Sequence, residues 1–266
     1  MTVAIVGMGL IGGSLGMALR RAGLRGVGVG RNPSRLRRAR ALRACHDWTT
    51  DPAEAARAAD VAVICTPVQT IPSLARRMAV ANPQLVITDA GSTKAGVCRA
   101  ARRPPLHGQF VGSHPIAGSE KKGIEAARHD LFRGAVCVLT PTARTSKDAV
   151  STVSRLWRRV GMRVLTMTPE QHDQALAGTS HLPHALATAL VHTLSKRSVR
   201  DLGAGSLRDM TRVASADPIQ WTQIFMTNRR GILRRTAAFR AAHRRFETYL
   251  RSGNARALQA WFRGAR

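Results

Sequence analysis

The sequence predicts an α/β protein in which a doubly wound, mostly parallel sheet is followed by an all-α domain. Up to residue 166, short apolar runs alternate with segments of helical spacing, as in sheets built from strand–helix–strand units. From residue 169 onward, segments 169–195 and 221–250 have helical spacing, and no further strand is expected. We therefore expect one domain at residues 1–167 and a helical domain at residues 168–266.

Each expected strand is an apolar run bounded by residues that favour turns. The unbroken run at 61–65 is typical of a parallel strand covered by helices on both faces. The expected strands are residues 3–6, 26–30, 61–65, 85–88, 110–111, 136–139 and 164–165. Helices are expected at 33–44 and 146–160, and Pro169 is expected in the first turn of a helix capped by Thr168.

The turn after the first strand has the glycine spacing G-x-G-x-x-G. Gly7 permits the tight turn, Gly9 lets backbone N–H groups approach a pyrophosphate, and Gly12 lets the next helix pack close to the sheet. The N-terminus of that helix then faces the phosphates, where its dipole favours negative charge. The order strand, turn and helix predicts a Rossmann-type dinucleotide site with contacts from Gly7, Gly9, Leu10, Ile11 and Gly12.

The end of the second strand predicts NADP rather than NAD as the cofactor. NAD sites usually place a carboxylate there, whereas this chain has Gly30, Arg31 and Asn32. The glycine leaves room for a 2′-phosphate, to which Arg31 offers a planar fork of donors. The alternative is that Arg31 does not bind the cofactor and is simply one of the many arginines of this arginine-rich chain. Thr66 and Pro67, after the strand at 61–65, are further expected cofactor contacts.

Composition and charge restrict the function classes. The formal net charge of +27 would suggest a nucleic-acid partner. However, only five of the 42 basic residues are lysine, and aromatic residues make up 4% of the chain, so stacking platforms for single strands are not expected. The charge is better explained by a solvated basic surface that attracts anionic metabolites.

Other partners are also limited by the sequence. No apolar run approaches the ~20 residues of a membrane span, and no leader precedes the first strand. We therefore expect a soluble cytoplasmic protein without specific nucleic-acid or membrane contacts. The four cysteines lack metal-ligand spacing, so neither a metal site nor a disulfide framework is expected.

Five motifs together resemble the prephenate/arogenate dehydrogenase family of tyrosine biosynthesis. They are residues 7–14, 89–94, 113–120, 180–184 and 207–221. The first is shared by many dehydrogenases, whereas the segments around His114 and Arg212 are more specific. The resemblance covers nearly the whole chain. It implies an oxidoreductase that carries out the NAD(P)-dependent oxidative decarboxylation of prephenate or arogenate, and a homodimer formed through the helical half.

The resemblance also implies roles for individual residues. His114 is the base that accepts the proton of the substrate 4-hydroxyl, and imidazole suits this role because its unperturbed pKa is ~6.5. Ser92 orients that hydroxyl and the nicotinamide. Arg212 holds a substrate carboxylate, with Arg208 as the alternative arginine.

Further substrate contacts follow from the same motifs. His181 contacts the substrate side chain, Trp221 closes the site around the ring, and Ser119 belongs to the substrate-binding set. Glu120 and Asp209 form an ionic network with the arginine near the entrance. His181 and His184 share a helix face, and one of the two is expected to be structural. No functional role is assigned to His46, His107, His129, His172, His192 and His243.

Two alternatives remain open at this stage. One is another two-domain NADP-dependent dehydrogenase of the β-hydroxyacid type or an imine reductase, which often uses a lysine of the helical domain. Lys196 is the only lysine after Pro169, and it lies away from the motifs. The other is a non-catalytic, cofactor-sensing protein that binds nucleic acid, which loss of Ser92 or His114 would have favoured. The motifs do not distinguish prephenate from arogenate or decide whether tyrosine inhibits.

Overall fold

The computed structural model describes residues 1–265 except 107, 119–120 and 195–202. The chain folds as two units. The first, here called the sheet unit, comprises Met1–Asp173 and Ser215–Thr227, and the second, the helical unit, comprises Gln174–Ala214 and Asn228–Arg266. This division places Ser215–Thr227 with the sheet, so the domain boundary expected between residues 167 and 168 stays a prediction.

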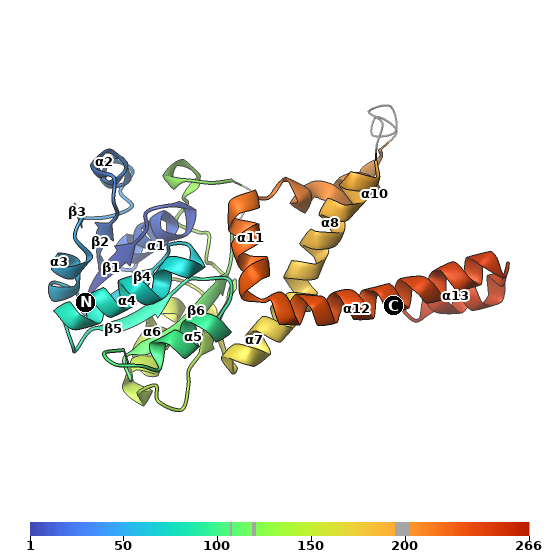
Figure 1. The fold of residues 1–266 in the computed structure, drawn as a ribbon. Helices are drawn as coiled ribbons and strands as arrows, with labels where there is room; N and C mark the ends of the chain where they lie inside the picture. Colours follow the sequence, from blue (N-terminus) through green and yellow to red (C-terminus); the bar gives the residue numbers. More distant parts are fainter. Residues whose placement is uncertain (107, 119–120, 195–202, 266) are drawn as a thin grey trace. The chain divides into compact units, whose positions relative to one another are not determined.

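Within the described residues, eight strands form one sheet in the order β3-β2-β1-β4-β5-β6-β7-β8. Figure 1 labels strands β1 to β6 of this sheet. The strands are β1 (Thr2–Val6), β2 (Arg25–Val29), β3 (Asp47–Thr49), β4 (Val61–Ile64), β5 (Val86–Asp89), β6 (Phe110–Ile116), β7 (Val136–Thr140) and β8 (Arg163–Thr166). All neighbouring strands are parallel except β6 and β7. The predicted doubly wound, mostly parallel sheet is therefore confirmed, and β3 is a strand that the sequence analysis did not include.

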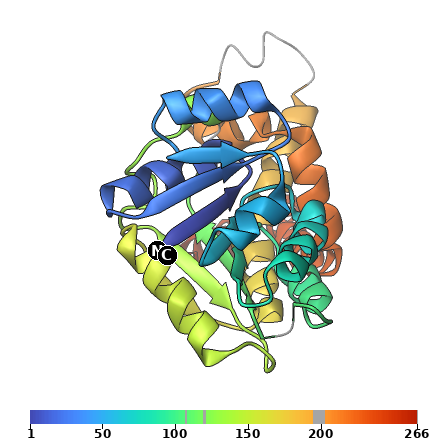
Figure 2. The same ribbon diagram turned by 90° about the vertical axis from the view of Figure 1, so that its left-hand side faces the viewer.

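Helices cover both faces of this sheet (Figure 2). The elements of the sheet unit are α1 (Leu10–Arg21), α2 (Pro33–Ala41), α3 (Pro52–Arg57), η1 (Val68–Thr70), α4 (Ile71–Ala81), α5 (Ala95–Ala101), η2 (Ile124–Ala126), α6 (Lys147–Arg159), the start of α7 (Pro169–Leu176) and α11 (Pro218–Thr227).

Alternation along each strand divides the core between the two faces. Ala4 and Val6 of β1 belong to the buried cluster that contains residues of α3, α4 and α5. Val3 and Ile5 belong to the opposite cluster, with residues of α1 and α6. Both faces of β1 are therefore buried, as expected of a central parallel strand.

Capping residues define where several helices begin. Asn32 accepts a hydrogen bond from the Arg35 backbone N–H at 3.1 Å, and Pro33 occupies the first turn of α2. At α7, the Thr168 hydroxyl accepts from the Gln171 backbone N–H, while the Gln171 side chain accepts from the Thr168 N–H. This reciprocal pair is a capping box, and it confirms the predicted cap. In contrast, α2 ends at Ala41, three residues before the predicted end at residue 44.

The helical unit contains the rest of α7, followed by η3 (Ala177–His181), α8 (Leu182–Thr193), α10 (Gly205–Thr211), η4 (Arg212–Ser215), α12 (Arg229–Arg251) and α13 (Ala255–Arg263). No strand occurs among its described residues, as predicted. Helix α13 packs against α12 through Trp261 and Phe246, whose ring centroids lie 5.4 Å apart. The helical segment predicted at 221–250 is interrupted at Asn228, between α11 and α12. Among the described helices, none is long and apolar enough to cross a membrane.

Candidate active site

The glycine turn lies at the point where the strand order reverses, because β1 has β2 on one side and β4 on the other. Ligands of doubly wound sheets bind beyond the carboxyl ends of the strands at such a point. Gly7 ends β1 with a φ of +98°, and a Cβ added there would lie 2.9 Å from Cγ2 of Thr66. Thr66, in the loop after β4, is therefore packed against this turn.

The other two glycines of the turn have the geometry that a dinucleotide requires. A Cβ on Gly12 would lie 2.0 Å from the carbonyl oxygen of Gly7, so only glycine lets α1 start this close to the turn. A Cβ on Gly9 would meet no atom within 4 Å, because this position faces open space. Open space beside the N-terminus of α1 fits a pyrophosphate. The residues present therefore fit a nicotinamide dinucleotide.

Arg31 and Asn32 follow the end of β2 but differ in their contacts. The Arg31 side chain is exposed and forms no hydrogen bond or ion pair with any residue in the described part of the chain. The oxygen of the Asn32 side chain is engaged in capping α2. Arg31 is thus available to an anionic ligand, whereas Asn32 orients the helix that follows it.

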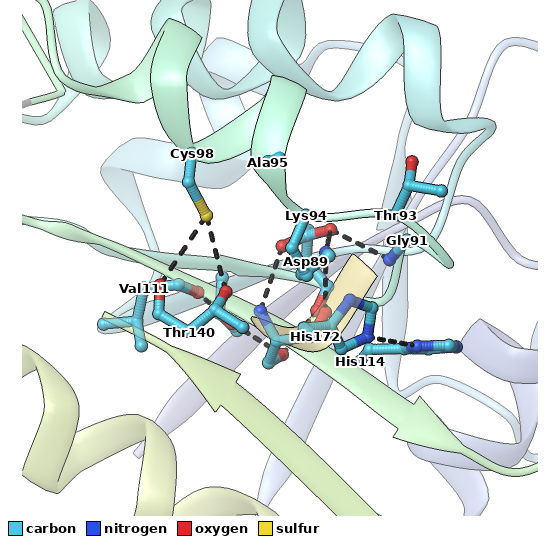
Figure 3. Close-up of polar contacts among 12 residues, drawn as sticks. Asp89, Gly91, Thr93, Lys94, Ala95, Cys98, Val111, His114, Thr140 and His172 are labelled. Carbon is cyan, nitrogen blue, oxygen red and sulfur yellow. Dashed lines mark hydrogen bonds and ion pairs between the residues drawn. The ribbon is translucent and has the colours of Figure 1, made fainter. Parts of the chain in front are cut away.

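A buried ion pair joins the loop that contains Ser92 to strand β6 (Figure 3). Asp89, at the end of β5, pairs with Lys94, and both side chains are fully buried. The Asp89 carboxylate also accepts hydrogen bonds from the backbone N–H groups of Gly91, at 2.9 Å, and Ser113, at 3.1 Å. Lys94 donates to the Ser113 carbonyl at 2.8 Å. Ser92 lies half-buried within this loop, and Ser113 directly precedes His114 in β6.

Strand β6 is longer than predicted, and its length positions His114. It pairs with β5 only at Phe110 and Val111, which is where the predicted strand ended. Beyond that point it continues as the antiparallel partner of β7, with His114 opposite Val138. His114 is consequently held in a sheet ladder rather than in a loop. The Ser113 hydroxyl, on the opposite face of β6, accepts a hydrogen bond from the Trp157 indole of α6 at 3.1 Å.

The structure places His172, to which the sequence analysis assigned no role, directly against His114. Nδ1 of His114 lies 2.9 Å from Nε2 of His172, and Nδ1 of His172 lies 2.8 Å from Oδ1 of Asp173 (Figure 3). His172 is completely buried. The signal in the sequence was weak, because it consists of a His-Asp dipeptide in the first turns of a helix far from the motif of His114.

Trp221 lies on α11, within the sheet unit, and is half-buried. Its ring packs against Phe225 at a centroid distance of 5.5 Å. The start of this helix is tied to the segment after β6 by Lys122, whose ammonium lies 2.7 Å from Asp217. This hydrogen bond from Lys122 lowers the pKa of Asp217 below its usual value.

The two histidines of the 180–184 motif occupy different environments in the helical unit. His181 is almost fully buried, and its Nδ1 lies 3.1 Å from the side-chain nitrogen of Asn228. His184 is half-buried and donates from Nδ1 to the Ser180 carbonyl at 2.9 Å. Burial lowers the pKa of His184, and the nearby charge of Arg212 lowers it further. The charge of Arg212 therefore acts on His184.

Other predicted residues are less informative. Arg208 and Asp209 lie on α10 and are exposed, whereas Pro67 follows Thr66 in the loop before η1. Ser119, Glu120 and Lys196 lie outside the described residues. Among the residues that the structure describes, no group of three or more His, Cys, Asp or Glu could hold a metal ion.

The cysteines near this site are unsuited to nucleophilic chemistry. Burial raises the pKa of Cys98 to about 11, and burial also raises the pKa of Cys65 and Cys137. A thiol must ionise to act as a nucleophile, so these groups remain inert near neutral pH.

Comparison with known proteins assigns the chain to a family. The model of the prephenate dehydrogenase nucleotide-binding domain matches residues 15–166, and the model of the prephenate dehydrogenase dimerization domain matches residues 168–264. The chain belongs to the prephenate dehydrogenase family. Membership makes it an oxidoreductase with a nicotinamide cofactor, and it removes the grounds for a β-hydroxyacid dehydrogenase or a non-catalytic sensor.

Three relatives illustrate the similarity. A cyclohexadienyl dehydrogenase of Zymomonas mobilis is 36% identical over 87% of this chain and 82% of its own length. The structure of a prephenate dehydrogenase from Aquifex aeolicus, in complex with hydroxyphenyl propionate and NAD+, has a TM-score of 0.94 and 32% identity, covering 100% of this chain and 96% of its own. An arogenate dehydrogenase of Synechocystis has a TM-score of 0.87 and 28% identity, covering 99% of this chain and 97% of its own.

Proposed function

We propose that this chain catalyses the oxidative decarboxylation of prephenate or arogenate. The observation that carries this proposal is His114, held in β6 at the edge of the sheet where ligands bind, with a hydrogen-bonded histidine behind it. A nicotinamide dinucleotide held at the glycine turn of Gly7, Gly9 and Gly12 would supply the acceptor for the hydride of the ring carbon that carries the 4-hydroxyl. His114 takes the hydroxyl proton, and the ring carboxylate leaves as CO2, so that the ring becomes a phenol.

The residues around His114 support this chemistry in the proposal. A neutral imidazole is a suitable base near neutral pH because its unperturbed pKa is ~6.5. Ser92 orients the substrate hydroxyl from the loop that the Asp89–Lys94 pair holds against β6. Trp221 covers the ring. Ser119, Glu120 and Asp209 complete the substrate-binding set by resemblance to the family.

Arg212 is proposed to bind a substrate carboxylate, for which a guanidinium is the better matched cation. Of the two histidines in the 180–184 motif, we propose that His184 accompanies it, because the charge of Arg212 acts on that ring. His181 is instead assigned a structural role with Asn228, since it is almost fully buried there.

The Arg212→Ala variant is expected to raise KM for the substrate about tenfold or more, because a charge-assisted hydrogen bond to a carboxylate contributes roughly 1.5–3 kcal/mol. The matched control is Arg208→Ala, which removes an exposed arginine one turn earlier in the chain. Steady-state kinetics on both variants measure the effect. A raised KM in the Arg208 variant alone would move the carboxylate contact to Arg208.

We propose NADP as the preferred cofactor, with Arg31 holding its 2′-phosphate. The exposed, unengaged guanidinium after β2 supports this, as does the absence of an acidic residue among residues 30–34. The Arg31→Ala variant is then expected to lose about tenfold in kcat/KM with NADP and to keep its value with NAD. Arg99→Ala, which removes an exposed charge from α5, controls for the general basic field. A wild-type preference for NAD would contradict the proposal.

The function itself is tested by supplying purified protein with prephenate or arogenate and following the reduced cofactor by absorbance. We expect turnover with at least one of the two substrates, and a competition assay ranks them. No turnover with either substrate, with both cofactors supplied, would contradict the proposed function.

We further propose a cytoplasmic homodimer, because residues 168–264 match a dimerization domain. Light scattering at several protein concentrations tests the dimer.

A further inference from the structure

We propose that His172 and Asp173 are positioning residues that hold His114 in the tautomer whose Nε2 accepts the substrate proton. The inference rests on the proposed function only for the identity of the proton donor. The tautomer itself is a property of the folded chain and can be measured without substrate.

Asp173 acts as a hydrogen-bond acceptor through both of its carboxylate oxygens. Its Oδ1 lies 2.7 Å from the Lys94 backbone N–H donor and 2.8 Å from Nδ1 of His172, and its Oδ2 accepts from the Ala95 N–H at 2.9 Å. An ionised carboxylate has no hydrogen to donate, so the partner nitrogen of His172 must carry the hydrogen. His172 is therefore the Nδ1–H tautomer when neutral.

The tautomer of His172 in turn determines the tautomer of His114. With the hydrogen on Nδ1, Nε2 of His172 has a lone pair and accepts. Because Nδ1 of His114 lies 2.9 Å from it, that nitrogen must donate. The neutral His114 ring then has its lone pair on Nε2, which makes Nε2 the basic nitrogen. Asp173 thus selects the basic atom of His114, to which it is linked through His172.

Burial of His172 and Asp173 strengthens their control over the tautomer of His114. His172 is completely buried and Asp173 is 5% exposed, so water does not readily replace either partner. In such surroundings a hydrogen bond is electrostatically stronger than in water. When His114 receives a proton, its Nδ1–H group continues to donate toward His172 and the Asp173 carboxylate, and this favours the imidazolium. The arrangement parallels the orientation of a catalytic histidine by a buried aspartate.

The fold holds the pair in place from both sides. The capping box of Thr168 and Gln171 starts α7, so that His172 and Asp173 fall in its first turns. The Asp173 carboxylate in turn receives the N–H groups at the start of α5. The other titratable groups facing this region are the Asp89–Lys94 ion pair, whose charges cancel, and the thiols of Cys98 and Cys137, whose pKa values burial raises.

Nitrogen NMR of histidine side chains tests the tautomer directly, without substrate. In the wild type we expect His114 and His172 as Nδ1–H tautomers. In Asp173→Asn, the neutral amide no longer requires a donor at Nδ1 of His172, so we expect the Nε2–H tautomers of His172 and His114 to become populated. An Nε2–H tautomer of His114 in the wild type would overturn the proposal, whether or not the protein oxidises prephenate.

Kinetics supply the second test. Asp173→Asn is expected to lower kcat by at least ~100-fold, the scale of losing a positioned base, while the affinity for the cofactor is unchanged. Loss of the negative charge also destabilises the imidazolium, so the acidic limb of kcat/KM is expected about one pH unit lower. His172→Gln, which keeps an acceptor oxygen, should retain more activity than His172→Leu.

The controls separate positioning from folding. His46→Gln changes another histidine of the sheet unit, whose Nδ1 accepts a hydrogen bond from the Gly26 N–H near the first residue of β2. This variant should leave kcat and the pH profile unchanged. If Asp173→Asn and His172→Leu lower activity only in proportion to lost folded protein, with the acidic limb unmoved, the pair is structural and the proposal fails. An inactive wild type with the expected tautomers contradicts the proposed function alone.

Discussion

Replacing His114 by asparagine is expected to lower kcat by at least ~100-fold while the affinity for the cofactor stays nearly unchanged. Asparagine is smaller than histidine and can still form hydrogen bonds, but it does not take up a proton near neutral pH. The substitution lies outside the glycine turn, where the dinucleotide fits, so binding of the nicotinamide cofactor should survive. Stopped-flow or steady-state kinetics measure kcat, and fluorescence titration measures the cofactor affinity.

The matched control for His114 is His129→Asn, because His129 is an exposed histidine that contacts Arg21 in the same unit. This variant should retain the wild-type kcat. If the kcat of the His114 variant equalled that of this control, His114 would not be the catalytic base. A parallel loss of cofactor affinity would instead indicate that β6 had been disturbed.

The Lys94→Met variant is expected to lose the most stability. Lys94 and Asp89 form an ion pair in which neither side chain is exposed, and the Lys94 ammonium also donates to the Ser113 carbonyl. Removing one partner of a buried pair leaves an uncompensated charge and typically costs about 3–5 kcal/mol. The loop with Ser92 and the strand with His114 would lose their shared anchor, so kcat should fall as well. Thermal unfolding at fixed protein concentration measures the change.

The comparison variant is Lys147→Met, which replaces an exposed lysine at the start of α6. Surface substitutions of this kind usually change stability by less than about 0.5 kcal/mol. Equal unfolding temperatures for the two variants would show that the buried pair contributes nothing to stability. The double variant Asp89→Asn with Lys94→Met should recover part of the loss, because neither member of the pair then leaves an uncompensated buried charge.

Much of the fold could be read from local patterns. The glycine turn between β1 and α1, the apolar run of β4 and the capping residue Thr168 each follow from residues adjacent in the chain. Their conformations depend on φ, on burial of a continuous run and on a nearby hydrogen-bond acceptor, which a short window of sequence contains. The strand β3 was missed because three residues at a sheet edge show no clear period.

Less of the site than of the fold could be predicted from local sequence patterns. The sequence motif indicated His114, but the predicted strand ended at Val111, because the residues that continue β6 pair with β7, twenty to 28 positions later. The motif led to the prediction of His181 rather than His184 for the substrate contact, and the different environments of the two rings come only from the structure. His172 had only a weak local signal, the His-Asp dipeptide, since its role depends on contact with a residue 58 positions away.

The sequence by itself determined the alternation of strands and helices followed by a helical half, the dinucleotide turn and the family, because these depend on periodicity and on motifs of neighbouring residues. Only the tertiary structure decided which side chains stand behind His114 and which ion pair holds its strand. Hydrogen bonds and ion pairs between distant residues depend on where the folded backbone brings them, and no spacing along the chain encodes that distance.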